Sequence, residues 1–157
     1  MGKDQKKVLK WMIMAMMMVL TVVGAVYAIT IPGFGKGDKV KAAKGTVTIP
    51  VTEVSDGKAH FYRFAQGDRE IGFFVVKGSD GKIHTAFDAC DVCYHEKKGY
   101  TQQGDYMICR NCNKRFAIIM IEGGRAGGCN PSHLSHQQLS GNIEISVNDL
   151  KTGARFF

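Results

Sequence analysis

The chain has 157 residues and a formal net charge of +7, which its two parts share unequally. Residues 1–45 hold eight Lys and two Asp (+6), which leaves 13 basic and 12 acidic residues (+1) for residues 46–157. The nearly neutral second part has no basic face to attract a phosphate backbone, so the charge excludes nucleic-acid binding. The length suits one modest domain with an appendage.

The first 31 residues predict a membrane anchor. A basic tail, residues 1–10, precedes an uncharged run of 21 residues from Trp11 to Ile31. At a rise of ~1.5 Å per residue such a helix is roughly 30 Å long, which is enough to cross a bilayer. The alternative is a cleaved secretory signal, since small residues flank Tyr27 where a signal peptidase would cut. The basic tail favours a cytoplasmic N-terminus and a domain on the other side, although four lysines also follow the run.

Residues 32–45, rich in Gly and Lys, predict a linker, and residues 46–157 predict one β-rich domain. Runs of β-branched and aromatic residues bounded by turn signals indicate strands. These runs lie at 46–54, 60–64, 71–76, 82–87, 99–108 (a hairpin), 116–121 and 143–147. No segment after residue 31 has a helical period. The predicted fold is therefore mainly β, a small antiparallel sandwich or barrel, preceded by one transmembrane helix.

Five cysteines fall within 40 residues of this domain. Cys90 and Cys93 form one C-x-x-C pair, Cys109 and Cys112 form a second, and Cys129 follows in a G-G-C-N-P segment. A C-x-x-C pair in a tight turn can aim both sulfurs at one point, and a hairpin can join two pairs into a thiolate cage. The spacing predicts a metal site. Zinc, a single iron ion and iron–sulfur clusters all accept four thiolates, so the metal stays open.

Other residues near the cysteines are candidate ligands. Cys129 could be a fifth thiolate, could replace one of the four, or could be a buried residue without a role at the site. His95 follows the first pair, and His133 and His136 follow Cys129 closely enough to reach the same centre. Each of these histidines is either a metal ligand or a solvated loop residue.

Three other uses of the cysteines compete with metal binding. Disulfides are common in exported proteins, but an odd number of cysteines in two tight pairs fits them poorly. A thioredoxin-like pair requires a helix start, and the surrounding pattern is strand and turn. Covalent haem attachment requires C-x-x-C-H, and Tyr94 stands where that histidine would be.

Several motifs together resemble the FtrD-like family of membrane iron–sulfur proteins, from about Thr46 to Val147. They are F-D-A-C-D-V-C (87–93), K-G-Y (98–100), G-D (104–105), C-R-N-C (109–112), Phe116 and G-G-C-N-P (127–131). The resemblance implies that the five cysteines are those of the family, and it implies a role in bacterial ferrous-iron transport with electron passage outside the cytoplasm. The order of strands and cysteine hairpins also resembles, distantly, Rieske-type domains. With the cysteine pairs, this resemblance adds a zinc-ribbon-like or Rieske-like metal-binding hairpin to the predicted β-sandwich or barrel, and it bears on the fold class alone.

Together these features predict a single-pass protein of the bacterial inner (cytoplasmic) membrane with an extracytoplasmic domain. Its five cysteines would bind an iron–sulfur cluster or iron, with zinc as the alternative. We expect an electron carrier, with a membrane redox protein or an iron permease as partner, and no substrate pocket of its own. The alternatives are a structural zinc module that binds a partner and, less favoured, a C-x-x-C thiol–disulfide oxidoreductase. The sequence does not indicate an oligomeric state.

Overall fold

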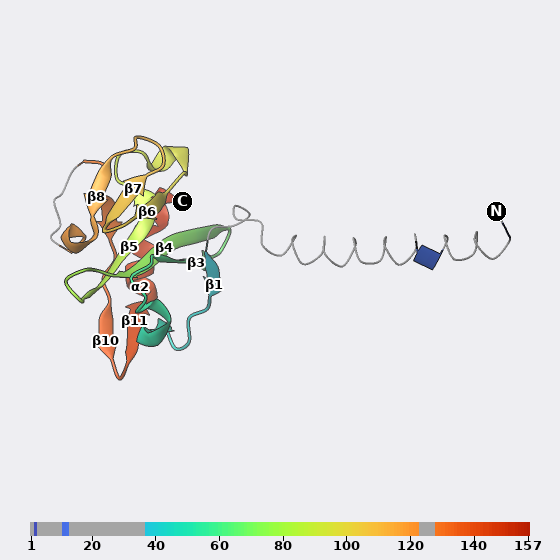
Figure 1. Ribbon diagram of the computed structural model, residues 1–157. Coiled ribbons are helices and arrows are strands. Elements are labelled where there is room, and N and C mark those ends of the chain that lie inside the picture. Colours follow the sequence, from blue (N-terminus) through green and yellow to red (C-terminus); the bar gives the residue numbers. More distant parts are fainter. Residues whose placement is uncertain (1, 3–10, 13–36, 123–127) are drawn as a thin grey trace. The chain divides into compact units, whose positions relative to one another are not determined.

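The computed structural model describes Gly2, Trp11, Met12, residues 37–122 and residues 128–157 (Figure 1). The chain divides into two compact units, Met1–Lys36 and Gly37–Phe157. Most of the predicted basic tail and nearly all of the predicted membrane span at residues 11–31 lie outside the described residues. No helix in the part of the chain that the structure describes is long and apolar enough to cross a membrane.

The second unit consists mainly of short strands arranged in three sheets. In chain order they are β1 (Asp38–Val40), β2 (Thr46–Pro50), β3 (His60–Gln66), β4 (Arg69–Lys77), β5 (Ile83–Cys90), β6 (Tyr100–Gln103), β7 (Tyr106–Cys109), β8 (Arg115–Ala117), β9 (Pro131–His133), β10 (Gln137–Leu139) and β11 (Asn142–Ser146). The sheet orders are β1-β3-β4-β5-β9, β10-β11-β2 and β6-β7-β8. Only the β1–β3 pair among these described strands is parallel. The prediction of a mainly β, antiparallel fold is confirmed, and β1 lies within the segment expected to be a linker.

The five-stranded sheet is the central layer, and its two faces bury different cores. Successive side chains of a strand point to opposite faces. On β4, Phe73 and Val75 therefore join a core that contains residues of β2 and β11, whereas Phe74 and Val76 join a second core with β6 and β7. Figure 1 shows β4 and β5 between the β10–β11 pair and the β6–β8 hairpins. A strand buried on both faces is held rigidly, which suits β5 to position functional groups.

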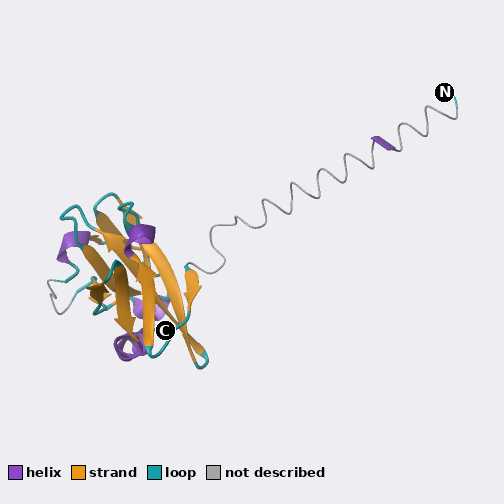
Figure 2. Cartoon of the chain, turned by 90° about the horizontal axis from the view of Figure 1, so that it is seen from below, coloured by secondary structure: helices purple, strands orange, loops and turns teal. Residues whose placement is uncertain are grey.

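Short helices occupy places where the sequence analysis expected strand or turn. They are η1 (Val51–Val54), η2 (Tyr94–Glu96), η3 (Ile118–Met120), α2 (Val147–Thr152) and η4 (Gly153–Phe156). Figure 2 shows them as single turns beside the strands. The α2 helix begins because the Ser146 hydroxyl accepts a hydrogen bond from the Asp149 N–H at 3.0 Å.

The predicted strand at 116–121 is wrong in its second half. β8 ends at Ala117, and the chain turns into η3. The run of apolar residues suggested a buried strand, but Ile119 and Met120 are 49% and 41% exposed. The turn is fixed by its backbone, since the Ile118 N–H donates to the Asp105 carbonyl at 3.0 Å.

One carboxylate connects the central sheet to the β6–β7 hairpin. Asp88 of β5 accepts a hydrogen bond from the backbone N–H of Tyr100 at 2.7 Å. Gly99, the preceding residue, has φ +63°, and a Cβ built on it would lie 2.6 Å from both carboxylate oxygens. The contact therefore requires glycine at 99. It positions the hairpin that carries Cys109 against the strand that carries Cys90.

We expect Gly99→Ala to destabilise the domain more than Gly104→Ala does. Both glycines have positive φ, which costs a non-glycine residue about 1–2 kcal/mol. Only at Gly99 would the new methyl meet Asp88, and overpacking adds about 1–3 kcal/mol. Chemical denaturation of the two variants gives the free energies of unfolding. Equal losses in both would show that the Asp88 contact does not constrain the hairpin.

Candidate metal centre

The first cysteine pair lies at the end of β5, where the strand turns into η2. Cys90 is the last residue of β5 and is buried, and Cys93 is the residue before η2. The backbone N–H groups of Val92 and Cys93 both point at the Cys90 sulfur. Amides arranged in this way stabilise a thiolate. The sequence folds locally into a turn that directs two backbone amides at the Cys90 sulfur.

The second pair has the same local structure at the end of β7. Cys109 ends the strand, and its carbonyl accepts a hydrogen bond from Asn113 at 2.9 Å. Asn113 has φ 58°, a left-handed conformation that Asn adopts more readily than most residues. The N–H groups of Asn111 and Cys112 point at the Cys109 sulfur, as Val92 and Cys93 do for Cys90. The two C-x-x-C segments are therefore equivalent turns at the ends of two strands.

Cys129 reaches the first turn through paired contacts of its neighbour Asn130. The Asn130 carbonyl accepts from the Asp91 N–H at 3.3 Å, and its side-chain amide donates to the Asp91 carboxylate at 3.0 Å. These two bonds hold the segment before β9 against the turn between Cys90 and Cys93. As a result the sulfurs of Cys93 and Cys129 lie 4.0 Å apart.

All five cysteine side chains come together at one place. Two groups of three have sulfur atoms within 4.8 Å of one another, and Cys93 belongs to both. The groups are Cys90, Cys93 and Cys129, and Cys93, Cys109 and Cys112. Sulfurs about 2.3 Å from a tetrahedral ion lie about 3.8 Å from each other, so the observed spacing suits ligation. Every one of the five is a free thiol.

The thiols experience different environments, and their pKa values diverge accordingly. The Lys114 N–H lowers the pKa of Cys112 to about 7. Burial opposes ionisation of Cys90, but the amides of its turn outweigh burial and its pKa lies below the ordinary value. Burial raises the pKa of Cys109 to about 11, and the neighbouring Cys112 sulfur raises that of Cys129 to about 12. Ionisation to the thiolate is therefore favoured at Cys90 and Cys112 and disfavoured at Cys109 and Cys129.

An apolar wall separates the sulfurs from the interior. Cys90 and Cys109 belong to the second core, together with Phe74, Tyr100 and Met107. The Tyr100 hydroxyl contacts the Cys90 sulfur, and burial and that contact raise the tyrosine pKa. The wall keeps water from one side of the site, and Tyr100 supplies a hydrogen-bond donor on that same side.

Of the three candidate histidines, none joins the thiol groups defined above. The His95 ring lies on the ring of Tyr94, with centroids 3.9 Å apart. His133 is exposed on β9 opposite Ala86, and His136 contacts Thr85 through Nδ1 at 2.9 Å. Both lie toward the start of β5, whereas Cys90 ends that strand.

Sequence reasoning missed two polar contributors to the cysteine site and one buried histidine elsewhere. Asp88 and Asp91 of the F-D-A-C-D motif hold the loops in place. His84 lies within the strand predicted at 82–87, and it is 1% exposed. The sequence signal for a buried histidine is its place within an apolar strand, four residues after an aspartate.

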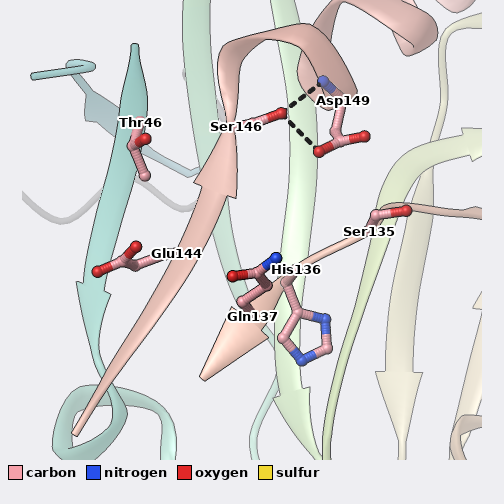
Figure 3. Close-up of a pocket in the computed structure, with 7 residues that line it drawn as sticks. All are labelled: Thr46, Ser135, His136, Gln137, Glu144, Ser146 and Asp149. Atoms are coloured by element: carbon pink, nitrogen blue, oxygen red, sulfur yellow. Dashed lines mark hydrogen bonds between the residues drawn. The ribbon is translucent and has the colours of Figure 1, made fainter. Parts of the chain in front are cut away.

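A polar pocket elsewhere in the domain is of a different kind. Its lining residues are Thr46, Ser135, His136, Gln137, Glu144, Ser146 and Asp149 (Figure 3). Two of these residues already have partners, because Ser146 and Asp149 form hydrogen bonds with each other as the N-cap of α2. Figure 3 shows these two side chains turned to each other and no sulfur among the lining side chains.

Comparison with known proteins gives a family match and a distant structural similarity. Residues 54–157 match the family described as membrane iron-sulfur containing protein FtrD-like. A search of curated proteins gives no match. Among solved structures, the crystal structure of the quaternary ammonium Rieske monooxygenase CntA with inhibitor MMV12 is similar at 10% identity and a TM-score of 0.44. The match covers 74% of this chain but only 32% of that one, and a similarity this low says nothing of a shared site or reaction.

The family match covers about two thirds of the chain and includes all five cysteines, Asp88 and Asp91. The cysteines it spans are those that the fold brings together. The chain belongs to the FtrD-like family of membrane iron–sulfur proteins.

Proposed function

We propose that the five cysteines hold an iron–sulfur centre and that the domain carries electrons for iron transport or handling. The observation that supports this most is the meeting of five free thiols in two groups that share Cys93. Membership of an iron–sulfur family agrees with the donor set. Thiolate sulfur is the ligand that such clusters use, so the residues fit the group.

The number of thiols favours a centre with more than one metal ion. A structural zinc site closes with four ligands. Here Cys129 adds a fifth sulfur, 4.0 Å from that of Cys93, and the Asp91–Asn130 contacts hold it there. A residue without a role at the site would not need such fixing. We therefore assign Cys129 to the ligand set together with the two C-x-x-C pairs.

The protein's own groups would hold and tune the centre. A bound cluster supplies a one-electron redox couple. Backbone amides in both turns and the Tyr100 hydroxyl donate to sulfur, and such donors together with burial set reduction potentials. The fixed turns would keep rearrangement small when the charge changes. These properties suit an electron carrier rather than an enzyme with its own substrate.

The proposed site has one side close to the surface. Val92, between the first two cysteines, is 58% exposed, whereas Cys90 itself is buried. A partner that covered Val92 would come near the sulfurs without entering the domain. We propose that this partner is a membrane redox protein or an iron permease, and that residues 11–31 anchor the chain in a bacterial inner membrane with the domain outside the cytoplasm.

Metal analysis of protein purified without oxygen tests the proposal. Wild-type protein should contain iron and acid-labile sulfide and should absorb near ~400 nm, as thiolate-bound iron generally does. Cys109→Ser should lose metal and stability together, because metal binding is coupled to folding at such sites. Cys129→Ser should lower the iron content as well, if the fifth thiol is a ligand.

Other outcomes would support the alternatives. A colourless protein with one zinc ion and no sulfide would indicate a structural module. Metal-free protein with a dithiol that oxidises and reduces reversibly would indicate thiol exchange. Unchanged iron content in Cys129→Ser would remove Cys129 from the ligand set and leave a four-thiolate site.

Tyr100→Phe should lower the midpoint potential while the iron content stays unchanged. The tyrosine hydroxyl lies beside the Cys90 sulfur, and a donor to sulfur stabilises the more negative, reduced state. The ring itself packs in the second core and is retained in phenylalanine. Phe116→Leu, which alters a partly buried neighbour without removing a donor, is the control. Redox titration measures both, and an unchanged potential in Tyr100→Phe would contradict a tuning role.

A further inference from the structure

The domain contains the same six-residue turn motif twice, once between η1 and β3 and once in the β4–β5 hairpin. Residues 55–60 read SDGKAH and residues 79–84 read SDGKIH. In each copy the aspartate accepts the backbone N–H two residues later, at 3.0 and 3.1 Å. In each copy the histidine Nε2 bonds the same aspartate, at 2.7 Å for His60 and 3.1 Å for His84. The repeat therefore forms one local structure in two places.

Burial separates the two histidines. The side chain of His60 is 31% exposed and that of His84 is 2% exposed. Asp80 is a carboxylate, so Nε2 of His84 must donate to it. In the neutral ring Nδ1 is then a lone-pair acceptor, and this buried atom has no hydrogen-bond partner. A buried acceptor without a partner destabilises the fold unless a ligand or protein donor satisfies it.

A second acceptor faces this nitrogen. The nearest Glu122 carboxylate oxygen lies 3.9 Å from His84 Nδ1, which is too far for a hydrogen bond. Two ligands about 2.1 Å from a tetrahedral ion would be about 3.4 Å apart, and Glu122 is exposed enough to close that difference. Two lone pairs that face each other across such a gap are complementary to a cation.

Further imidazoles stand at the same place. Glu122 lines a cavity together with His133, Ser135 and His136. The Thr85 hydroxyl donates its one hydrogen to the Leu134 carbonyl, so Nδ1 of His136 must donate to Thr85 at 2.9 Å. Nε2 of a neutral His136 is then also a lone-pair acceptor. His84 and His136 thus both use one nitrogen on the protein and keep the other for a ligand.

We propose that His84, Glu122 and His136 bind a divalent first-row transition-metal ion, with His133 at the wall of the site. The ligand atoms of these three residues do not all lie within 4.8 Å of one another, so binding requires the exposed Glu122 side chain to move between the two imidazoles. Imidazole and carboxylate ligands suit ions such as Fe²⁺ and Zn²⁺, and the Asp80 carboxylate fixes His84 as outer carboxylates commonly fix metal-binding histidines.

The proposed site is separate from the cysteine centre and does not depend on what the cysteines hold. His84 and Cys90 are six residues apart on the same strand, which is roughly 20 Å. The thiols offer only sulfur ligands, whereas this site offers nitrogen and oxygen.

Equilibrium dialysis of the full chain against Zn²⁺, without oxygen, tests the site. Wild-type protein should hold one equivalent more than Glu122→Gln and His136→Gln, whatever number the cysteines retain. His60→Gln is the matched control, because it changes the exposed copy of the same motif and should bind as wild type does. A stoichiometry in Glu122→Gln or His136→Gln equal to that of wild type overturns the site, and so does an equal loss in His60→Gln.

The aspartates of the two turn motifs give a second matched pair. Asp80→Asn offers His84 an amide that can reverse its tautomer, and Zn²⁺ affinity should fall about 10–100-fold. Asp56→Asn makes the same change beside His60 and should leave the affinity unchanged. Equal affinities in these two variants contradict the proposal. The visible spectrum of the cysteine centre, followed in the same samples, shows separately whether that centre is intact.

Discussion

The mutual repulsion of sulfur charges is the constraint on which the site depends. Five thiols meet in two groups of three that share Cys93, and two of the five are buried in an apolar core. Like charges that share a site raise one another's pKa, and low polarity strengthens the effect. Burial raises the pKa of Cys109, with the Cys90 charge adding to it, and the neighbouring Cys112 sulfur raises that of Cys129, whereas backbone amides lower the pKa of Cys112 and Cys90. The chain alone therefore does not stabilise five thiolates, and a bound cation would supply the missing charge.

The fold answers this constraint by fixing each sulfur through its backbone. The two C-x-x-C turns begin where buried strands end, and the third segment is held by the contacts between Asp91 and Asn130. Asp88 connects the strand of one pair to the hairpin of the other. Because β5 lies in a sheet covered on both faces, displacement of one turn would disturb both cores. Rigidity at the sulfurs is thus a consequence of where the strands end.

Much of this arrangement could be predicted from the sequence, and the misses have physical causes. The cysteine spacing and the glycine-containing turns predicted converging pairs on a β scaffold, since both depend on local geometry. The strand predicted at 116–121 failed because hydrophobic residues do not all face a core, and Ile119 and Met120 are exposed. The α2 helix is only six residues long, too short to show a helical period in the sequence, and it depends on the cap at Ser146. The contacts of Asp88, Asp91 and His84 depend on which strands become neighbours.

The repeated turn motif shows how far local sequence determines chemistry. SDGKAH and SDGKIH form the same turn and the same histidine–aspartate bond. The two copies differ in what packs against the histidine. Glu122, which follows η3, lies beside His84 in the second copy, whereas His60 in the first copy is partly exposed to solvent. Water can satisfy the free nitrogen of His60, but a buried nitrogen requires a protein or ligand partner. The same residues are thus a surface turn in one setting and a potential coordination site in the other. Tertiary contact, rather than the motif, determines which of the two each copy becomes.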